Sequence, residues 1–252
     1  MHQLGVLQPV VELLGHASPR VRARAARCVR AAAANNAPFQ KTLLEQHPDA
    51  LTSLMTLLAG ADEQPAAAAL AALGAVLRNS AAARGAFYLG AGLPHLQLLL
   101  RDGQRPLGMR RTALGLLTDL LQEDTEVLAA AMVKGTAAGL DAPAAVHAAL
   151  QLLAHPEADR DIQEKALLLL QLLLEREPEA PGLLSEAGAA TQLAELQAEL
   201  QATIAAARGS SSRRIDNGDG GGGYLQELAA LVAAVQRSMA GRDGVQLVHT
   251  EL

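Results

Sequence analysis

A leucine-rich pattern that recurs four times is the feature that most constrains the fold of this chain. It occupies residues 10–14, 54–58, 96–100 and 149–153, and every copy ends in two adjacent leucines. The second leucines of the four pairs are 44, 42 and 53 residues apart. The first two spacings match the period of about 40–47 residues in armadillo and HEAT repeats. The third spacing indicates an insertion, which we place at residues 135–143.

Each copy of the pattern is followed by a short break and then by a longer helical segment. Proline marks three of the breaks, at Pro19, Pro65 and Pro106, near the start of the next helix, where a missing N–H is tolerated. We therefore expect repeats of two helices each, stacked because one repeat cannot bury its apolar face alone. The longer segments span residues 21–35, 66–79, 108–122 and 161–175.

The composition favours helices over strands. Half of the 252 residues are hydrophobic but only 2% are aromatic, so the apolar side chains are almost entirely those of Ala, Leu and Val. Strands draw on β-branched and aromatic residues, which are scarce here. We therefore expect an all-α fold, an α-solenoid of armadillo-like repeats over residues 1–176.

The chain after residue 176 shows a different pattern. We expect residues 177–240 to form a C-terminal helical cap, since the end of a solenoid needs a capping element. Residues 209–223 are rich in Ser and Gly, which predicts a flexible loop within this cap. The last residues, 241–252, are expected to be a mobile tail.

Charge and composition exclude several classes of function. The net charge of −5 and the isoelectric point near 5.8 argue against nucleic-acid binding, which requires a basic excess. No apolar run reaches the roughly 18 residues of a membrane-spanning helix, so we expect no membrane insertion. The single cysteine, Cys28, excludes an internal disulfide, and its position predicts a small core residue.

We find no pattern typical of catalysis or metal binding. The seven histidines are scattered, without the His-x-x-x-His spacing that places two ligands on one helix face. The prediction is a non-enzymatic, monomeric protein without cofactor or metal, whose function is to grip another protein. The alternative of an enzyme would need a polar pocket with convergent titratable groups.

Polar residues recur along the predicted second helices. On the first of these, Arg20, Arg24, Arg27 and Asn35 fall within about one quadrant at 100° per residue. Equivalent helices of stacked repeats line one concave surface, so this stripe can continue onto the next two helices. A merely solvated basic face is the alternative. The residues on the next two helices are Arg78, Asn79, Arg110, Arg111 and Asp119.

Several segments resemble one family. Residues 25–40 form an Ala-rich helix that ends in Asn35-Asn36 and leads to Gln40, and they resemble the first armadillo repeat of the Fes/Sil-type nucleotide exchange factors. Residues 153–157 with 164–167, and residues 223–228, resemble a late repeat and the C-terminal helix of the Sil-type, endoplasmic-reticulum member. Asn36 and Lys165 fall within these motifs and complete the predicted partner-binding set.

Both ends of the chain bear on its location. The C-terminal His249-Thr250-Glu251-Leu252 resembles the His-Asp-Glu-Leu retrieval signal, with Thr250 in place of Asp. The first residues lack the charged start and apolar stretch of a signal peptide, and we expect that an N-terminal part is missing. The lumen of the endoplasmic reticulum is the expected location, and the cytoplasm is the alternative.

The resemblance implies a co-chaperone. Such a solenoid wraps lobe II of the nucleotide-binding domain of a DnaK-family chaperone such as BiP and holds its lobes apart, so that ADP leaves. The alternative with the same fold is an armadillo scaffold or adaptor that recognises extended peptides through an Asn-lined groove.

Overall fold

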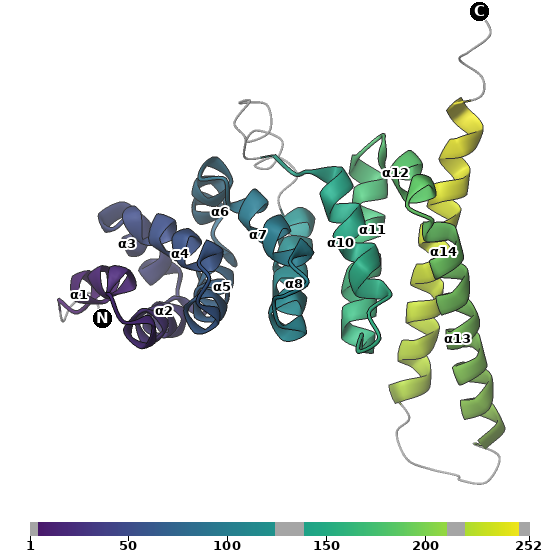
Figure 1. Ribbon diagram of the computed structural model, residues 1–252, viewed down its shortest axis with the longest axis horizontal. Helices are drawn as coiled ribbons and strands as arrows, with labels where there is room; N and C mark the ends of the chain where they lie inside the picture. The colour runs from purple at the N-terminus through teal and green to yellow at the C-terminus, as the bar shows by residue number, and fades with distance from the viewer. Residues whose placement is uncertain (1–4, 124–138, 211–219, 247–252) are drawn as a thin grey trace, which may run out of the picture. The chain divides into compact units, whose positions relative to one another are not determined.

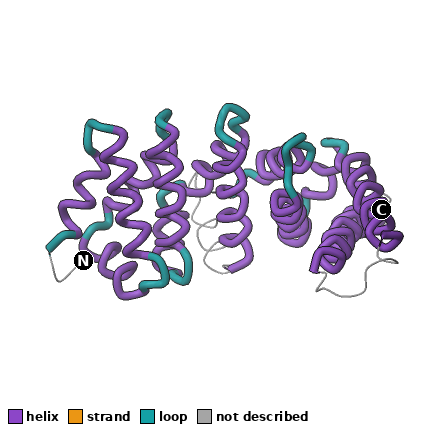
Figure 2. Tube along the Cα trace, turned by 90° about the horizontal axis from the view of Figure 1, so that it is seen from below, coloured by secondary structure: helices purple, strands orange, loops and turns teal. Residues whose placement is uncertain are grey.

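The computed structural model describes residues 5–123, 139–210 and 220–246 (Figure 1). Over these ranges the regular structure is entirely helical and contains no strand (Figure 2). The expected all-α class is therefore confirmed. The chain divides into two compact units, Met1–Asp141 and Ala142–Leu252. The boundary expected after residue 176 falls inside the second unit, between two of its helices.

The first unit stacks repeats of three helices rather than two. In each repeat a short helix precedes the expected pair, because Asn36 and Ser80 cap the start of a further helix directly after each long one. The expectation of two-helix repeats was wrong on this point. The helices are α1 (Leu7–Glu12), η2 (Leu13–Gly15), α2 (Pro19–Ala33), α3 (Ala37–Gln46), α4 (Asp49–Ala59), α5 (Glu63–Leu77), α6 (Ala81–Leu89), α7 (Gly92–Arg101) and α8 (Leu107–Glu123).

Equivalent helices of successive repeats lie side by side. The long helix α5 contacts both α2 and α8, and α4 contacts both η2 and α7. The second leucine of each pair is buried in this stack, at Leu14, Leu58 and Leu100. The recurring leucines therefore mark the core side of each middle helix, as a repeat with a shared core requires.

A tight turn joins α6 to α7. Gly90 ends α6, Ala91 has a left-handed φ of 60°, and α7 begins at Gly92. A Cβ atom on Gly92 would clash with the Phe87 ring. Glycine is therefore required there by the close approach of the ring rather than by the backbone angle.

The second unit consists of five described helices. Its longest helix, α14, packs on α11, α12 and α13, and the Tyr224 hydroxyl of α14 lies 2.6 Å from a Glu164 carboxylate oxygen and 3.2 Å from the Arg160 carbonyl. Burial, with the hydrogen bond to Glu164, raises the pKa of Tyr224. The helices are α10 (Ala142–Leu153), α11 (Arg160–Arg176), α12 (Ala180–Glu186), α13 (Ala189–Ser210) and α14 (Gly220–Gln246).

Two sequence expectations about the C-terminal region need adjustment. Helix α13 continues to Ser210 and α14 begins at Gly220, so the expected loop at 209–223 is helical at both ends. The expected tail at 241–252 begins as helix, because α14 extends to Gln246. Residues 135–138 of the expected insertion and the retrieval-like residues 249–252 lie outside the described residues, whereas α10 begins within the insertion, at Ala142.

Cys28 is exposed on α2, which corrects the expectation that it belongs to the core. The buried side of this helix is taken by Ala25, Ala26 and Val29 instead. Cys28 lies next to Arg27, which is also exposed. Because the apolar stripe of α2 is made largely of alanine, the sequence does not define the edge of the buried side, and Cys28 lies just outside it.

Candidate partner-binding surface

The ends of α2 and α5 share one local structure. Each helix is followed by an asparagine with a left-handed backbone, Asn35 with φ 52° and Asn79 with φ 60°, a conformation that asparagine tolerates better than most residues. The next residue caps the following helix: Asn36 accepts a hydrogen bond from Phe39 N at 3.2 Å, and Ser80 plays the same part in the next repeat. The predicted site residues Asn35, Asn36 and Asn79 thus have a structural task.

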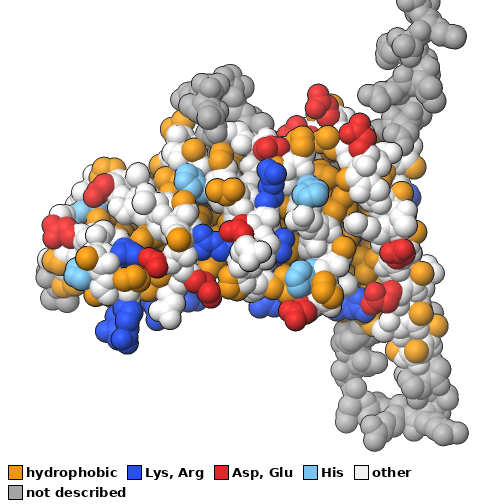
Figure 3. All heavy atoms as spheres, in the orientation of Figure 1, with side chains coloured by type: hydrophobic (Ala, Val, Ile, Leu, Met, Phe, Trp, Pro, Cys, Tyr) orange, Lys and Arg blue, Asp and Glu red, His pale blue; other side chains and the backbone are white. Residues whose placement is uncertain are grey.

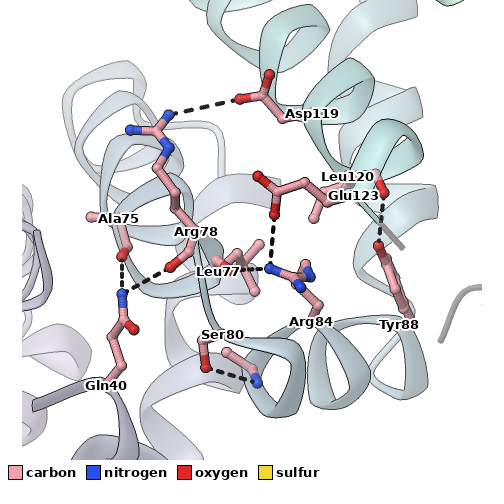
Figure 4. A network of polar contacts seen from close by, with 11 residues as sticks. Gln40, Ala75, Leu77, Arg78, Ser80, Arg84, Tyr88, Asp119, Leu120 and Glu123 are labelled. Atoms are coloured by element: carbon pink, nitrogen blue, oxygen red, sulfur yellow. Dashed lines mark hydrogen bonds and ion pairs between the residues drawn. The ribbon is translucent and has the colours of Figure 1, made fainter. Parts of the chain in front are cut away.

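Gln40 links the first of these helix ends to the second. It is 3% exposed, and its Nε2 donates to the Ala33 carbonyl at 3.2 Å, at the end of α2. The same nitrogen donates to the Ala75 and Arg78 carbonyls at 2.9 and 3.0 Å, at the end of α5 (Figure 4). The last carbonyls of a helix have no hydrogen-bond donor within that helix. The Gln40 side chain therefore supplies a donor to such carbonyls of two helices.

Arg84 repeats this arrangement one period later. It lies 44 residues after Gln40 and, like it, four residues after the capping residue. Its guanidinium donates to the Leu77 carbonyl at 3.2 Å, and it pairs with Glu123 at the end of α8 at 2.8 Å (Figure 4). The Arg84 side chain is only 9% exposed. We call Gln40 and Arg84 the inter-repeat clamps.

Two further contacts join α5 and α6 to α8. The Tyr88 hydroxyl donates to the Leu120 carbonyl at 3.4 Å. Arg78 pairs with Asp119 at 3.7 Å, with both side chains about half exposed (Figure 4). An exposed pair of this kind stabilises a fold by about 0–1 kcal/mol. The Arg78–Asp119 pair can therefore open, and each side chain can pair with a charge on a partner, with little loss of fold stability.

Arg24 and Arg27 are exposed on α2. In the first unit the structure thus brings Arg78 beside Asp119, and places the two α2 arginines on the helix that packs against α5. Arg111 is half-buried on α8. Whether these residues bind a partner stays a prediction.

Arg110 does not belong to an exposed surface, which corrects its place in the predicted set. It is 5% exposed, and its Nε donates to the Leu100 carbonyl at 2.9 Å. Burial lowers the pKa of the guanidinium, although Asp102 opposes this effect. Arg22, two periods of 44 residues earlier, likewise donates to carbonyls of the preceding loop. Arg22 and Arg110 therefore have structural roles, which Ala66, at the equivalent position of the repeat between them, does not share.

Lys165 belongs to the second unit. It lies on α11 and pairs with Asp161 one turn earlier. The helices α2, α5 and α8 belong to the first unit, so Lys165 is not assigned to their surface. The retrieval-like residues His249, Thr250, Glu251 and Leu252 lie outside the described residues.

A hollow lies between the first two repeats of the first unit. It has a volume of about 400 Å³ and is lined by Leu14, Thr56, Leu57 and Pro65, with Arg22 and Asp62 at its edge. Asp62 is the one acidic residue in its lining and pairs with Arg22 at 2.6 Å. The lining of this hollow thus holds a single carboxylate, which is already paired with a guanidinium.

Within the described ranges, no group of three or more His, Cys, Asp or Glu side chains is placed to hold a metal ion. Over the same ranges, no helix combines the length and apolar character needed to cross a membrane.

Solved structures similar to this chain include two designed armadillo repeat proteins and a further engineered protein. A computationally designed armadillo repeat protein for modular peptide recognition is 21% identical, with a TM-score of 0.66 over 94% of this chain and 83% of its own. A designed armadillo repeat protein in complex with the peptide (KR)4 is 20% identical, with a TM-score of 0.63 over 92% and 82%. An engineered protein is 19% identical, with a TM-score of 0.63 over 97% and 90%. The α-solenoid of armadillo-like repeats is therefore confirmed.

Sequence comparison addresses the family directly. No curated protein matched the chain. Residues 1–141, which include the whole first unit, match the SIL1/FES1/HPBP1 C-terminal domain. The chain therefore belongs to the SIL1/FES1/HPBP1 family of nucleotide exchange factors, whose partners are chaperones of the Hsp70 (DnaK) type.

Proposed function

We propose that this protein is the nucleotide exchange factor of a lumenal, BiP-like chaperone, whose nucleotide-binding domain it grips to promote ADP release. The observation that carries the proposal is the match of the first unit to the family domain. The retrieval-like end His249-Thr250-Glu251-Leu252 supports a lumenal location. We further propose that the protein acts as a monomer, which analytical ultracentrifugation would test.

The inter-repeat clamps suggest how the grip works. An exchange factor shifts its partner towards an open conformation only to the extent that it binds that conformation more tightly than the closed one. Such discrimination needs a surface that keeps its shape. Gln40 and Arg84 hold neighbouring repeats together at the ends of α2, α5 and α8, while Arg78 and Asp119 offer exposed charges beside them.

Stopped-flow release of a fluorescent ADP analogue tests the activity. The protein is expected to accelerate release from BiP, and an unchanged rate at saturating protein would reject the proposal. A cytosolic Hsp70 measured in parallel tests the choice of chaperone. Faster release from the cytosolic protein alone would refute the lumenal assignment and leave the family activity intact.

Charge exchange at Arg78 and Asp119 tests this part of the surface. Reversing either charge should weaken binding of the chaperone. The double variant Arg78→Asp/Asp119→Arg should restore the ion pair but not the affinity for the chaperone. If the double variant binds like the wild type, the pair acts within the protein and not on a partner.

The location can be tested separately. The chain is fused behind a signal peptide, with or without residues 249–252, and secretion into the medium is measured. Retention of the full chain and secretion of the shortened one are expected. Equal secretion would refute a retrieval function of this tetrapeptide.

A peptide-binding scaffold is the second candidate, because two of the similar structures are designed armadillo proteins, one built for peptide recognition and one bound to a peptide. The exposed arginines of α2 would repel a basic peptide such as the one bound there. Affinity capture that yields many disordered partners and no chaperone would favour this candidate.

A further inference from the structure

Helix α2 carries a one-sided excess of positive charge. Its 15 residues include five arginines and no acidic residue. Arg20, Arg24 and Arg27 are spaced by four and three residues, which places them within about 60° on the helix. All three side chains are exposed, and Figure 3 shows Lys and Arg side chains gathered over α2 at the lower left. We call these three residues the arginine row.

The arginine row is not used by the fold. Arg22, on another side of α2, donates to the His16 and Ala17 carbonyls and pairs with Asp62. Among the residues that the structure describes, no hydrogen bond or ion pair reaches the three arginines of the row. Their guanidinium groups, each with five N–H donors, are therefore available to another molecule.

The row also opposes the stability of its own helix. Arg20 lies in the first turn, where the helix dipole disfavours a cation by about 0.3–1 kcal/mol. Arg24 is four residues from Arg20 and three from Arg27, and like charges at these spacings cost about 0.2–0.5 kcal/mol per pair. Glutamine at these positions would serve the helix at least as well.

The neighbouring helix α5 carries one acidic residue, Glu63, and no charge at the positions equivalent to the row. One period of 44 residues after the row, α5 carries Gln64, Ala68 and Ala71. The positive charge is also local, since residues 1–141 contain 13 Lys and Arg against 11 Asp and Glu, while residues 142–252 contain 8 against 15. A partner that approaches α2 therefore meets a concentrated positive field on a protein of negative net charge.

We propose that the arginine row docks onto a cluster of carboxylates on the surface of the chaperone's nucleotide-binding domain. This inference rests on the proposed function. Exposed charges at the edge of an interface act mainly on the association rate, because they steer the encounter before the surfaces make contact. The row thus accelerates association, while the ends of α5 and α8 retain the chaperone once it has bound.

The test compares two triple variants of equal net charge. The first, Arg20→Gln/Arg24→Gln/Arg27→Gln, removes the row and keeps helix propensity. The control, Lys41→Gln/Arg101→Gln/Arg237→Gln, removes three exposed cations from other helices. Association with the chaperone's nucleotide-binding domain is measured by stopped flow across ionic strength, and circular dichroism verifies that both variants are folded.

At low salt the row variant should associate at least about tenfold more slowly than the wild type, and the control less than about twofold. The difference should shrink near 1 M salt, where screening acts over about 3 Å. Equal rates for row variant and wild type, equal losses in both variants, or a loss that persists at high salt would each overturn the inference. Each of these results leaves ADP release by the wild type intact. A wild type that neither binds the chaperone nor releases ADP would overturn the proposed function, and the inference with it.

Discussion

Replacing Gln40 by leucine should loosen the interface between the first two repeats. Leucine is similar in volume but cannot donate to the carbonyls of Ala33, Ala75 and Arg78, which Gln40 Nε2 reaches at 2.9–3.2 Å. The amide nitrogen carries two protons, so the substitution removes two full hydrogen bonds shared among three acceptors.

The magnitude follows from the burial of this site. A buried acceptor that loses its partner costs about 1–3 kcal/mol, and the apolar surface of leucine offsets part of this loss. We expect a decrease of about 2–4 kcal/mol in the stability of the α2–α5 interface. At about 1.4 kcal/mol per factor of ten, local opening should become roughly 30- to 700-fold more frequent.

Amide hydrogen exchange is the appropriate assay, because a solenoid opens repeat by repeat and need not unfold in one step. Faster exchange is expected at the ends of α2 and α5 and not in the second unit. Gln46→Leu is the matched control, since Gln46 is exposed on the same helix, α3. If Gln40→Leu and Gln46→Leu differ by less than about 0.5 kcal/mol, the typical range for surface substitutions, Gln40 is not a clamp.

Three further predictions concern other sites. Asn79→Ala should lower the free energy of unfolding in urea by about 1–2 kcal/mol, because the backbone at Asn79 is left-handed. Asn79→Gly should lower it less, and equal losses would contradict the backbone explanation. Gly92→Ala should destabilise the fold by about 1–3 kcal/mol, because a Cβ would meet the Phe87 ring. Gly74→Ala lies in open space within α5 and should stabilise the fold by about 0.5–1 kcal/mol. Thermal unfolding should show a lower Tm for the first variant and a higher Tm for the second. The pKa of Tyr224 is raised in the folded state. Its contribution to the free energy of unfolding is therefore complete below about pH 10 and is lost as pH rises towards the folded-state pKa. Between about pH 9 and pH 11 the free energy of unfolding should fall more for the wild type than for Tyr224→Phe. An equal fall in both proteins would refute this assignment.

The sequence was sufficient to predict the periodic parts of the fold. The recurring leucine pairs located the middle helices, and the segments after each break located α2, α5, α8 and α11 to within about three residues. Periodicity succeeds there because the buried side of each helix is set by the same stacking in every repeat.

The sequence analysis does not predict the short helices α3 and α6, because it interprets Asn35, Asn36 and Asn79 as partner-binding residues and assigns no role to Ser80. Asn35-Asn36 and Asn79-Ser80 have the side chains expected of a left-handed residue followed by a helix cap. The recurrence of a cap and a polar residue four positions later, at Asn36 and Gln40 and again 44 residues on, was available as a signal.

The candidate surface was harder to predict than the fold. Arg110 and Arg111 are adjacent and therefore point about 100° apart on a helix, so at most one of them could lie on a given face. Which one is buried depends on the carbonyl of Leu100, ten residues away, which Arg110 reaches. Such contacts arise from tertiary structure, and local patterns do not encode them.

The clamps connect the stability of the solenoid to its proposed activity. A stiff surface that fits the open conformation of the chaperone binds the closed conformation more weakly. A softened surface adapts to both conformations, so the difference between its two affinities becomes smaller. Gln40→Leu should therefore lower the rate of ADP release at saturation several-fold, while the dissociation constant for the chaperone changes less. Titration calorimetry and stopped-flow release at saturating protein measure the two quantities, with Gln46→Leu as the control. If hydrogen exchange shows the interface loosened and saturated release stays at the wild-type rate, stiffness between the first two repeats is not what opens the chaperone.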